Sequence, residues 1–398
     1  MTAQAIPRGT NGVTRGRPLR PRPDYVYGNT RLRARFPLLL SRAELLALTG
    51  RSPEAILGSL PALALRDGVR ASVRDEAGAD IGGDGGTSGG TSDGARVGVA
   101  SAGSANAGPS TGWGSATGNT EMTALRTVQA LLQAQLRGLR GLYVGPAMDA
   151  VMILLARHDL ADVLALVRGA RAGAPTAHRL AAVLAVGAIE EDVAREVAAA
   201  TDASSTVGRL VALGLPDPDT AQVLARAWAT FQLHDDPLEF ETTVATAAVT
   251  RWLALAHAAG RDARPVAAFV QSECDRANLL VALGSPTGQV MRLLPDHRPT
   301  AAALRGTREE VLAAAAAARP AWRPALERFA ADGDRGALAA ALDTVEWDLA
   351  LRGRRLGNPL DASVPVSYVV AVEGQARALR WLLQTHRRPI DVPLLPSR

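Results

Sequence analysis

An all-α fold is predicted by three features of the sequence. Apolar residues recur at three-to-four spacing, helix-start signals recur along the chain, and runs of alternating β-branched residues are few. Ala, Leu, Arg and Glu, which favour helices, dominate from Thr120 to about Arg388. With 398 residues, the chain is long enough for two or three domains, each able to bury an apolar core.

The N-terminal region divides into a tail and a first group of helices. Residues 1–24 are predicted to be a disordered tail, because they are rich in Pro, Gly and Arg and have no apolar periodicity. Helical spacing begins at Tyr25. Ser41 and Glu44 have the spacing of a capping box, in which each side chain binds the backbone amide of the other residue. Ser52 before Pro53 predicts a second helix start.

A glycine-rich stretch interrupts the first helical region. Residues 78–118 contain 14 Gly in 41 residues and almost no large side chain, which is typical of flexible coil. Its GWGSATG segment faintly resembles a phosphate-binding loop, but the glycine spacing does not fit and no strand precedes it. We therefore expect a flexible loop inserted into the first domain.

Helix-start signals continue through the rest of the chain. Asp202 precedes one amphipathic stretch, and Asp217 before Pro218 opens another. Thr307 and Glu310 have the spacing of a second capping box. These signals predict helices on both sides of the middle of the chain.

Three segments of the sequence look alike. They span residues 156–169, 272–285 and 372–385, and in each a polar residue stands four positions before an apolar one. Residues four apart share one face of a helix. The repeat distances of 116 and 100 residues are the size of a domain. The paired positions are Asp159 with Val163, Asp275 with Leu279, and Gln375 with Leu379.

A second internal likeness supports a chain of three similar helical domains. Residues 38–60 resemble residues 187–210. The first segment lies further from its following repeat, at Asp159, than the second lies from Asp275, and the glycine-rich insertion accounts for the difference. The predicted domains are residues 25–168, 169–284 and 285–398.

The sequence offers few groups for catalysis or metal binding. The single cysteine, Cys274, excludes an internal disulfide and is expected to be a small buried side chain. None of the six histidines pairs with another at ligand spacing, and His234-Asp235-Asp236 before Pro237 predicts a helix cap rather than a metal site. We expect no catalytic, cofactor-binding or metal-binding residues.

Charge and hydropathy limit the partners and the location. The net charge is +5, and because the chain has no lysine, all 44 basic residues are arginines, interleaved with Asp and Glu along most of the chain. A nucleic-acid binder would more often gather its arginines on one stripe, so a nucleic-acid regulator is disfavoured. Neither a secretory signal nor a membrane span is expected, since the apolar runs are short, and a cytoplasmic location is predicted.

From Tyr25 to Pro389 the sequence resembles the C subunit of the V-type and A-type rotary ATPases, which in eukaryotes is called the d subunit. The resemblance rests on the opening Y-x-Y-x-N-x-R-x-R-x-R, on D-x-x-N-L in the second repeat, and on NPLDASVPVSYVVAVEGQARALRWLL near the end. The chain departs from the family at Asp162, where Asn is frequent, and at Gln375 and Ala378, where Glu and Asn are usual. The residues that carry the resemblance are Tyr25, Tyr27, Asn29, Arg31, Arg33, Arg35, Asp159, Asp275, Asn278 and Tyr368.

This resemblance implies a non-catalytic subunit without cofactors. It implies a funnel of three similar helical domains around a pseudo-threefold axis, which passes torque between the rotor shaft subunits and the membrane proteolipid ring. For Asp159 and Asp275, bonds to a neighbouring arginine or to backbone of the same domain are favoured over contact with a partner. The arginines of the opening motif, Arg31, Arg33 and Arg35, are expected to be solvated or to bond within the chain. A generic helical repeat scaffold with an unrelated partner remains the alternative.

Overall fold

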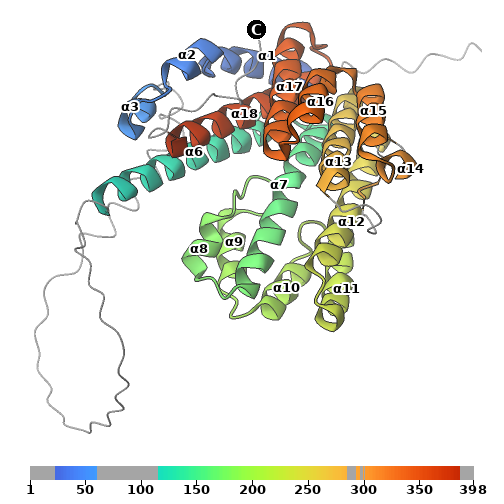
Figure 1. The fold of residues 1–398 in the computed structure, drawn as a ribbon. Coiled ribbons are helices and arrows are strands. Elements are labelled where there is room, and N and C mark those ends of the chain that lie inside the picture. Colours follow the sequence, from blue (N-terminus) through green and yellow to red (C-terminus); the bar gives the residue numbers. More distant parts are fainter. Residues whose placement is uncertain (1–22, 61–114, 285–292, 296–298, 300, 386–398) are drawn as a thin grey trace, which may run out of the picture.

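The computed structural model describes residues 23–60, 115–284, 293–295, 299 and 301–385. Within these ranges the regular structure is helical and no strand occurs, which confirms the all-α prediction (Figure 1). Residues 1–22 of the predicted tail and residues 78–114 of the predicted loop lie outside the described residues. The predicted loop ends earlier than expected, because a helix already begins at Ser115. Extending an existing helix by a turn is easy compared with starting one, so weak helix formers can join its end.

The second and third N-terminal helices begin where their caps predict, whereas the first already begins at Pro23, inside the predicted tail. The Ser41 hydroxyl accepts a hydrogen bond of 3.3 Å from the Glu44 amide, and the Glu44 carboxylate accepts one of 2.6 Å from the Ser41 amide. The Ser52 side chain caps the next helix. These elements are α1 (Pro23–Arg35), the 3-10 turn η1 (Phe36–Leu38), α2 (Arg42–Ala47) and α3 (Pro53–Gly58).

Three pairs of long helices form the framework of the molecule. The second helix of each pair contains the polar residue and the apolar residue of one of the three repeat segments. A short loop joins the two helices of each pair, as is usual for helices that follow one another in a compact fold. The pairs are α6 (Ser115–Arg140) with α7 (Gly145–Arg171), α12 (Pro237–Ala258) with α13 (Arg264–Gly284), and α17 (Arg335–Leu356) with α18 (Ser363–Thr385).

Shorter helices lead into the second and third pairs. The predicted caps are confirmed: Asp202 and Asp217 accept hydrogen bonds from the first backbone amides of α10 and α11, and Thr307 forms a capping box with Glu310. Before the second pair come α8 (Thr176–Ala181), α9 (Glu191–Ala198), α10 (Ala203–Ala212) and α11 (Pro218–His234). The remaining elements are η2 (Arg261–Ala263), α14 (Ala301–Leu304), α15 (Arg308–Ala318), η3 (Pro320–Trp322) and α16 (Arg323–Asp332).

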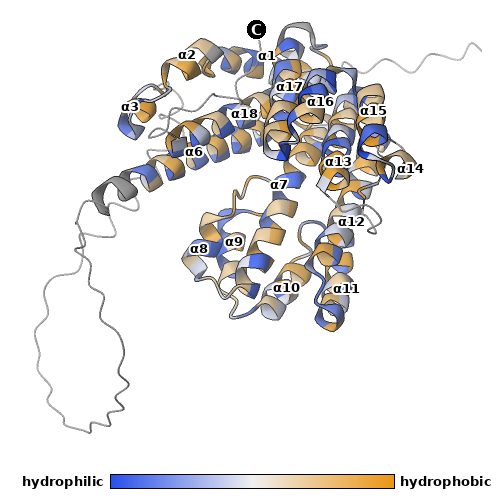
Figure 2. Ribbon diagram, in the orientation of Figure 1, coloured by the Kyte–Doolittle hydropathy of each residue, from blue (hydrophilic) through white to orange (hydrophobic). Residues whose placement is uncertain are grey.

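The three predicted domains share an apolar core. The larger cluster of buried side chains contains residues from all three, from Tyr25 through Leu253 to Leu383, and a smaller cluster surrounds Trp322. Hydrophobic and hydrophilic residues alternate around the long helices, as expected for helices with one buried face (Figure 2). The last helix, α18, lies along α6 and contacts α1, so the two ends of the described chain pack together (Figure 1).

Candidate functional site

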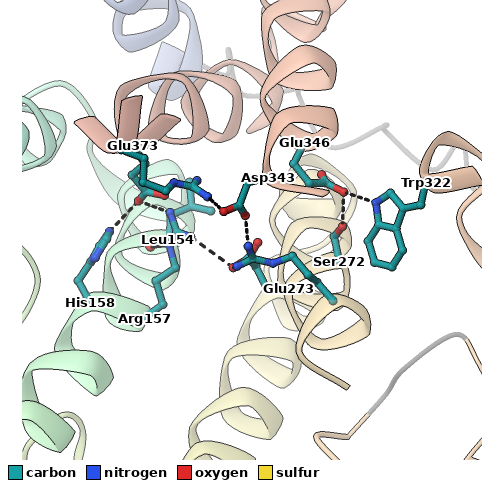
Figure 3. Close-up of polar contacts among 11 residues, drawn as sticks. Leu154, Arg157, His158, Ser272, Glu273, Trp322, Asp343, Glu346 and Glu373 are labelled. Carbon is teal, nitrogen blue, oxygen red and sulfur yellow. Dashed lines mark hydrogen bonds and ion pairs between the residues drawn. The ribbon is translucent and has the colours of Figure 1, made fainter. Parts of the chain in front are cut away.

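The three repeat helices meet at a partly buried cluster of charged side chains (Figure 3). Arg157 of α7 forms an ion pair with Glu373 of α18, and its Nη1 lies 3.9 Å from Oε2 of Glu273 on α13. In the repeat alignment, each of the three residues stands two positions before the polar residue of its copy, namely before Asp159, Asp275 and Gln375. Equivalent positions of the three copies therefore converge, and the arginine of the first copy faces a glutamate of each of the others.

The ion pairs continue onto the first helix of the third pair. Arg276 donates a hydrogen bond of 3.0 Å to Glu273 and also pairs with Asp343 of α17. Asp343 pairs in turn with Arg377 of α18. Alternating charges thus run without a break from α7 through α13 and α17 to α18, and they join all three helix pairs.

Glu373 is the most enclosed acid of this cluster, with a side chain that is 13% exposed. Its Oε1 lies 2.8 Å from Nε2 of His158. Burial alone would raise the pKa of Glu373, but the Arg157 guanidinium and the hydrogen bond with His158 outweigh it and lower the pKa to about 2. Glu373 is therefore held in its charged form by the two residues of α7.

A second hydrogen-bonded group, around Glu346, extends the cluster toward the smaller apolar core. Oε1 of Glu346 accepts hydrogen bonds from the Ser272 hydroxyl at 2.9 Å and from the Trp322 indole at 3.1 Å (Figure 3). Trp322 is almost fully buried. Since a buried indole needs an acceptor for its N–H, Glu346 joins η3 and α17 of the third copy to α13 of the second.

The predicted acid of the first repeat binds backbone amides. Asp159 is 1% exposed, and its two oxygens accept hydrogen bonds from the amides of Ala188 at 2.8 Å and Ile189 at 3.0 Å. Burial raises the pKa of Asp159 to about 6, because it outweighs the effect of these two hydrogen bonds. The bonds are intramolecular, but the partners lie beyond residue 168, the predicted end of the first domain.

The neighbouring Asp162 holds the same extended segment, residues 183–190. It accepts hydrogen bonds of 2.8 Å from the amides of Leu184 and Ala185, and burial raises its pKa. On the other side of the segment, Arg137 of α6 donates to the Ala185 carbonyl at 2.8 Å, and Arg140 donates to the Gly187 carbonyl at 3.2 Å. Side chains of the first helix pair thus satisfy the backbone polar groups of a segment that forms neither helix nor sheet.

Close approach explains why glycine stands at position 187. A Cβ atom added there would lie 2.1 Å from Oδ2 of Asp159, far inside van der Waals contact. Any larger residue would push the segment away from α7 and break the two hydrogen bonds to Asp159.

The second repeat binds the third copy through side chains and backbone. Asp275 is fully buried, and the Nε of Arg319 donates a hydrogen bond of 2.8 Å to its Oδ2. Asn278 accepts a hydrogen bond from the Leu294 amide at 2.8 Å and donates one to the Leu294 carbonyl at 3.0 Å. As with Asp159, the bonds are intramolecular, but both partners lie beyond residue 284, the predicted end of the second domain.

The third repeat binds the N-terminal segment. Oε1 of Gln375 accepts a hydrogen bond of 2.9 Å from the Leu40 amide, 335 residues away along the chain. Gln375 is 8% exposed. The third copy is therefore hydrogen-bonded to the N-terminal part of the first copy.

Asn29, from the predicted opening motif, joins loops of two helix pairs. It is 1% exposed, and its Nδ2 donates hydrogen bonds to the carbonyls of Pro359 at 2.8 Å and Asp361 at 3.0 Å, in the loop between α17 and α18. Its Oδ1 accepts a hydrogen bond of 2.7 Å from the hydroxyl of Tyr143, in the loop between α6 and α7. The Ala362 amide reaches the Asp262 carbonyl at 3.0 Å, which adds the loop of the remaining pair.

The aromatic residues and arginines of the motif divide between a buried and an exposed face of α1. Tyr25 is buried against Tyr143, and Arg33 donates a hydrogen bond of 2.8 Å to the Gly357 carbonyl. Arg35 forms a hydrogen bond with Tyr368, whose ring packs edge-on against Phe36. On the other face, Tyr27 is 57% exposed, and its hydroxyl accepts hydrogen bonds of 3.1 and 2.9 Å from Arg31.

Sequence reasoning singled out the repeat positions but missed the charged cluster beside them. One position of the repeat is an arginine in the first copy, Arg157, and a glutamate in the other two, Glu273 and Glu373. This difference in charge is the sequence signal that points to their pairing. Cys274 is buried, as predicted, and Asp236 caps α12. Among the described residues, no group of three or more His, Cys, Asp or Glu side chains is arranged to hold a metal ion.

The comparison of the chain with known protein families agrees with the resemblance. A family model described as ATP synthase (C/AC39) subunit matches residues 111–391, more than half of the chain, and its range includes all three repeat segments. The motif from Tyr25 to Arg35 lies outside the matched residues. None of the curated proteins compared with the chain matches it. Within the described part of the chain, no helix combines the length and apolar character needed to cross a membrane. The chain belongs to the ATP synthase (C/AC39) subunit family, which is the family of the C, or d, subunits of the V-type and A-type ATPases.

Proposed function

We propose that the chain is a non-catalytic central-stalk subunit that links the rotor shaft to the membrane proteolipid ring. In this role it transmits torque, so that ATP turnover in the soluble part is coupled to proton or sodium transport in the membrane part. The observation that carries the proposal, beside family membership, is the unbroken chain of ion pairs from Arg157 to Arg377 across all three helix pairs. A body whose parts are joined at its centre resists twisting, and densely packed interiors transmit strain.

The three helix pairs support a funnel of three similar domains around a pseudo-threefold axis. The domains would be residues 25–168, 169–284 and 285–398, with the shaft subunits seated in the opening and the proteolipid ring at the other end. The chain would then be peripheral to the membrane, on its cytoplasmic face, and held there by the ring. This role needs contact area and stiffness, and neither a cofactor nor nucleic acid takes part in it.

Loss of the subunit from the complete ATPase tests this function. Membranes containing the whole complex are compared with membranes prepared without this chain, and ATP turnover and ion pumping are measured together. We expect hydrolysis to continue without pumping when the chain is absent, and we expect the purified chain alone not to hydrolyse ATP. Pumping at normal efficiency without the chain would refute the proposal. Co-purification of a tagged chain with an unrelated partner, instead of shaft and ring subunits, would favour the scaffold alternative.

A further inference from the structure

The same position of the repeat helix binds the same backbone amide in two copies. Residues 38–60 and 187–210 are alike, and aligning their first residues places Leu40 opposite Ile189. The Ile189 amide donates a hydrogen bond of 3.0 Å to Asp159 of α7, and the Leu40 amide donates one of 2.9 Å to Gln375 of α18. Asp159 and Gln375 are themselves equivalent in the repeat. The two hydrogen bonds are therefore equivalent contacts, one made by the first copy and one by the third.

The two contacts differ in how the chain connects them. Asp159 binds the segment between α8 and α9, which lies 30 residues further along the chain and leads into the second copy. Gln375 binds a segment 335 residues earlier in the sequence. The third copy therefore contacts the first copy in the way that the first copy contacts the second. Between the first and second copies the chain itself is continuous, but between the third and first copies only non-covalent contacts hold the molecule closed.

The closing contact is chemically the weaker of the two. Asp159 offers two carboxylate oxygens to two amides, whereas Gln375 offers one neutral amide oxygen to one. Hydrogen bonds to a charged acceptor are about twice as strong as those between neutral groups. Asn29 and Arg33 reinforce the same joint by binding carbonyls of the loop between α17 and α18.

We propose that Gln375 is a positioning residue that closes the three copies into a ring and holds the joint between the third and first copies under torsional load. Its side chain fixes the Leu40 backbone against α18 and thereby sets how the N-terminal helices lie on the last helix pair. The closure stands on the contacts alone, whereas its role under load rests on the torque function proposed above.

The closure is tested by hydrogen exchange on the full chain with three variants. Gln375→Leu replaces the acceptor by an apolar side chain of similar size. Gln375→Glu keeps an acceptor, a carboxylate like that of Asp159 in the first copy. Gln384→Leu, on the exposed face of the same helix, is the matched control. We expect exchange of the Leu40 amide to rise about tenfold in Gln375→Leu and to stay near the wild-type rate in the other two variants.

The Ile189 amide serves as the internal reference, because Asp159 still holds it in every variant. If Leu40 exchange in Gln375→Leu equals that of the wild type, the closure is overturned. If the exchange of Ile189 rises by the same factor as that of Leu40, the whole molecule has loosened and a local closing role is equally overturned. Gln375→Glu keeps the inference testable even if Gln375→Leu unfolds, since loss of Leu40 protection in a variant that retains the acceptor would refute it.

The role under load is tested in the assembled ATPase. We expect Gln375→Leu to lower the number of ions pumped per ATP, with hydrolysis maintained, whereas Gln375→Glu and Gln384→Leu pump normally. Normal pumping in Gln375→Leu, together with faster Leu40 exchange, would overturn the role under load while the closure stands. Normal pumping in membranes that lack the whole chain would instead refute the proposed function, so the two failures are distinguishable.

Discussion

Replacing Arg157 by methionine tests whether the charged cluster holds the three helix pairs together. Methionine keeps an unbranched apolar side chain but removes the guanidinium that pairs with Glu373 and faces Glu273. The substitution also removes the cation–π contact with Phe269, whose ring centre lies 4.6 Å from the guanidinium carbon. Glu373 keeps His158 as its remaining partner on α7.

The magnitude follows from how enclosed the pair is. The side chains of Arg157 and Glu373 are 20% and 13% exposed, and removing one partner of a buried pair costs about 3 to 5 kcal/mol. Residual solvent contact and the hydrogen bond with His158 reduce this cost, so we expect the free energy of unfolding to fall by about 2 to 3 kcal/mol. The pair of Arg168 and Glu241, from α7 to α12, is 57% and 29% exposed, and Arg168→Met is expected to cost about 0 to 1 kcal/mol.

Both variants are compared with the wild type by urea unfolding followed by far-ultraviolet circular dichroism. A double-mutant cycle of Arg157→Met with Glu373→Gln should give a coupling energy of about 1 to 3 kcal/mol. Equal costs for Arg157→Met and Arg168→Met, or a coupling energy near zero, would show that the cluster contributes no more than an exposed ion pair. A chain of ion pairs that contributes so little could not stiffen the molecule against twisting.

Perturbations at four further residues follow from the contacts described above. Because burial raises the pKa of Asp159 to about 6, the folded state binds a proton at this carboxylate more tightly than the unfolded state does. Lowering the pH from about 6 to 4 should therefore raise the free energy of unfolding. This increase should be absent in Asp159→Asn. Glu373 should change the free energy of unfolding in the opposite direction. Because its pKa is lowered from 4.5 to about 2, the stability that it contributes is complete above pH 4.5 and is lost as the pH falls toward 2. This contribution is measured as the difference in free energy of unfolding between the wild type and Glu373→Gln. Gly187→Ala should destabilise by about 1 to 3 kcal/mol through its clash with Asp159, whereas Gly208→Ala, in an open helical position, should stabilise by about 0.5 to 1 kcal/mol in the same unfolding assay. Asn29→Leu should cost about 2 kcal/mol and expose α1 to limited proteolysis, because the buried Tyr143 hydroxyl loses its acceptor; unchanged cleavage would contradict the role of Asn29.

The parts of the fold that depend on near neighbours in the sequence were predictable. Ser41 and Glu44, or Thr307 and Glu310, lie three residues apart, so both partners of each capping box are visible in one short window. Asp202 likewise bonds the amide of Ser205. Helix starts were therefore predicted correctly in all these places.

The charged cluster was not predictable in the same way. The three residues that meet at its centre lie 116 and 100 residues apart along the chain, and no local pattern distinguishes them from arginines and glutamates on solvated faces. The repeat alignment supplies the missing information, since it places Arg157, Glu273 and Glu373 at one position with opposite charges. An intramolecular role for Asp159 and Asp275 was predicted, but their partners depend on how the copies pack and not on the sequence near them.

The contacts of Asn29 also set a limit on when the N-terminal helix can finish folding. Its acceptors, the carbonyls of Pro359 and Asp361, lie 330 and 332 residues later in the chain. At a translation rate of about 5 to 20 residues per second, they leave the ribosome roughly 15 to 70 seconds after Asn29 does. Throughout that interval the ring of Phe36, which is buried in the finished protein, lacks Tyr368 as its packing partner. The nascent chain is therefore expected to present a partly uncovered α1 to the chaperones of the cell until the last helix pair has been synthesised.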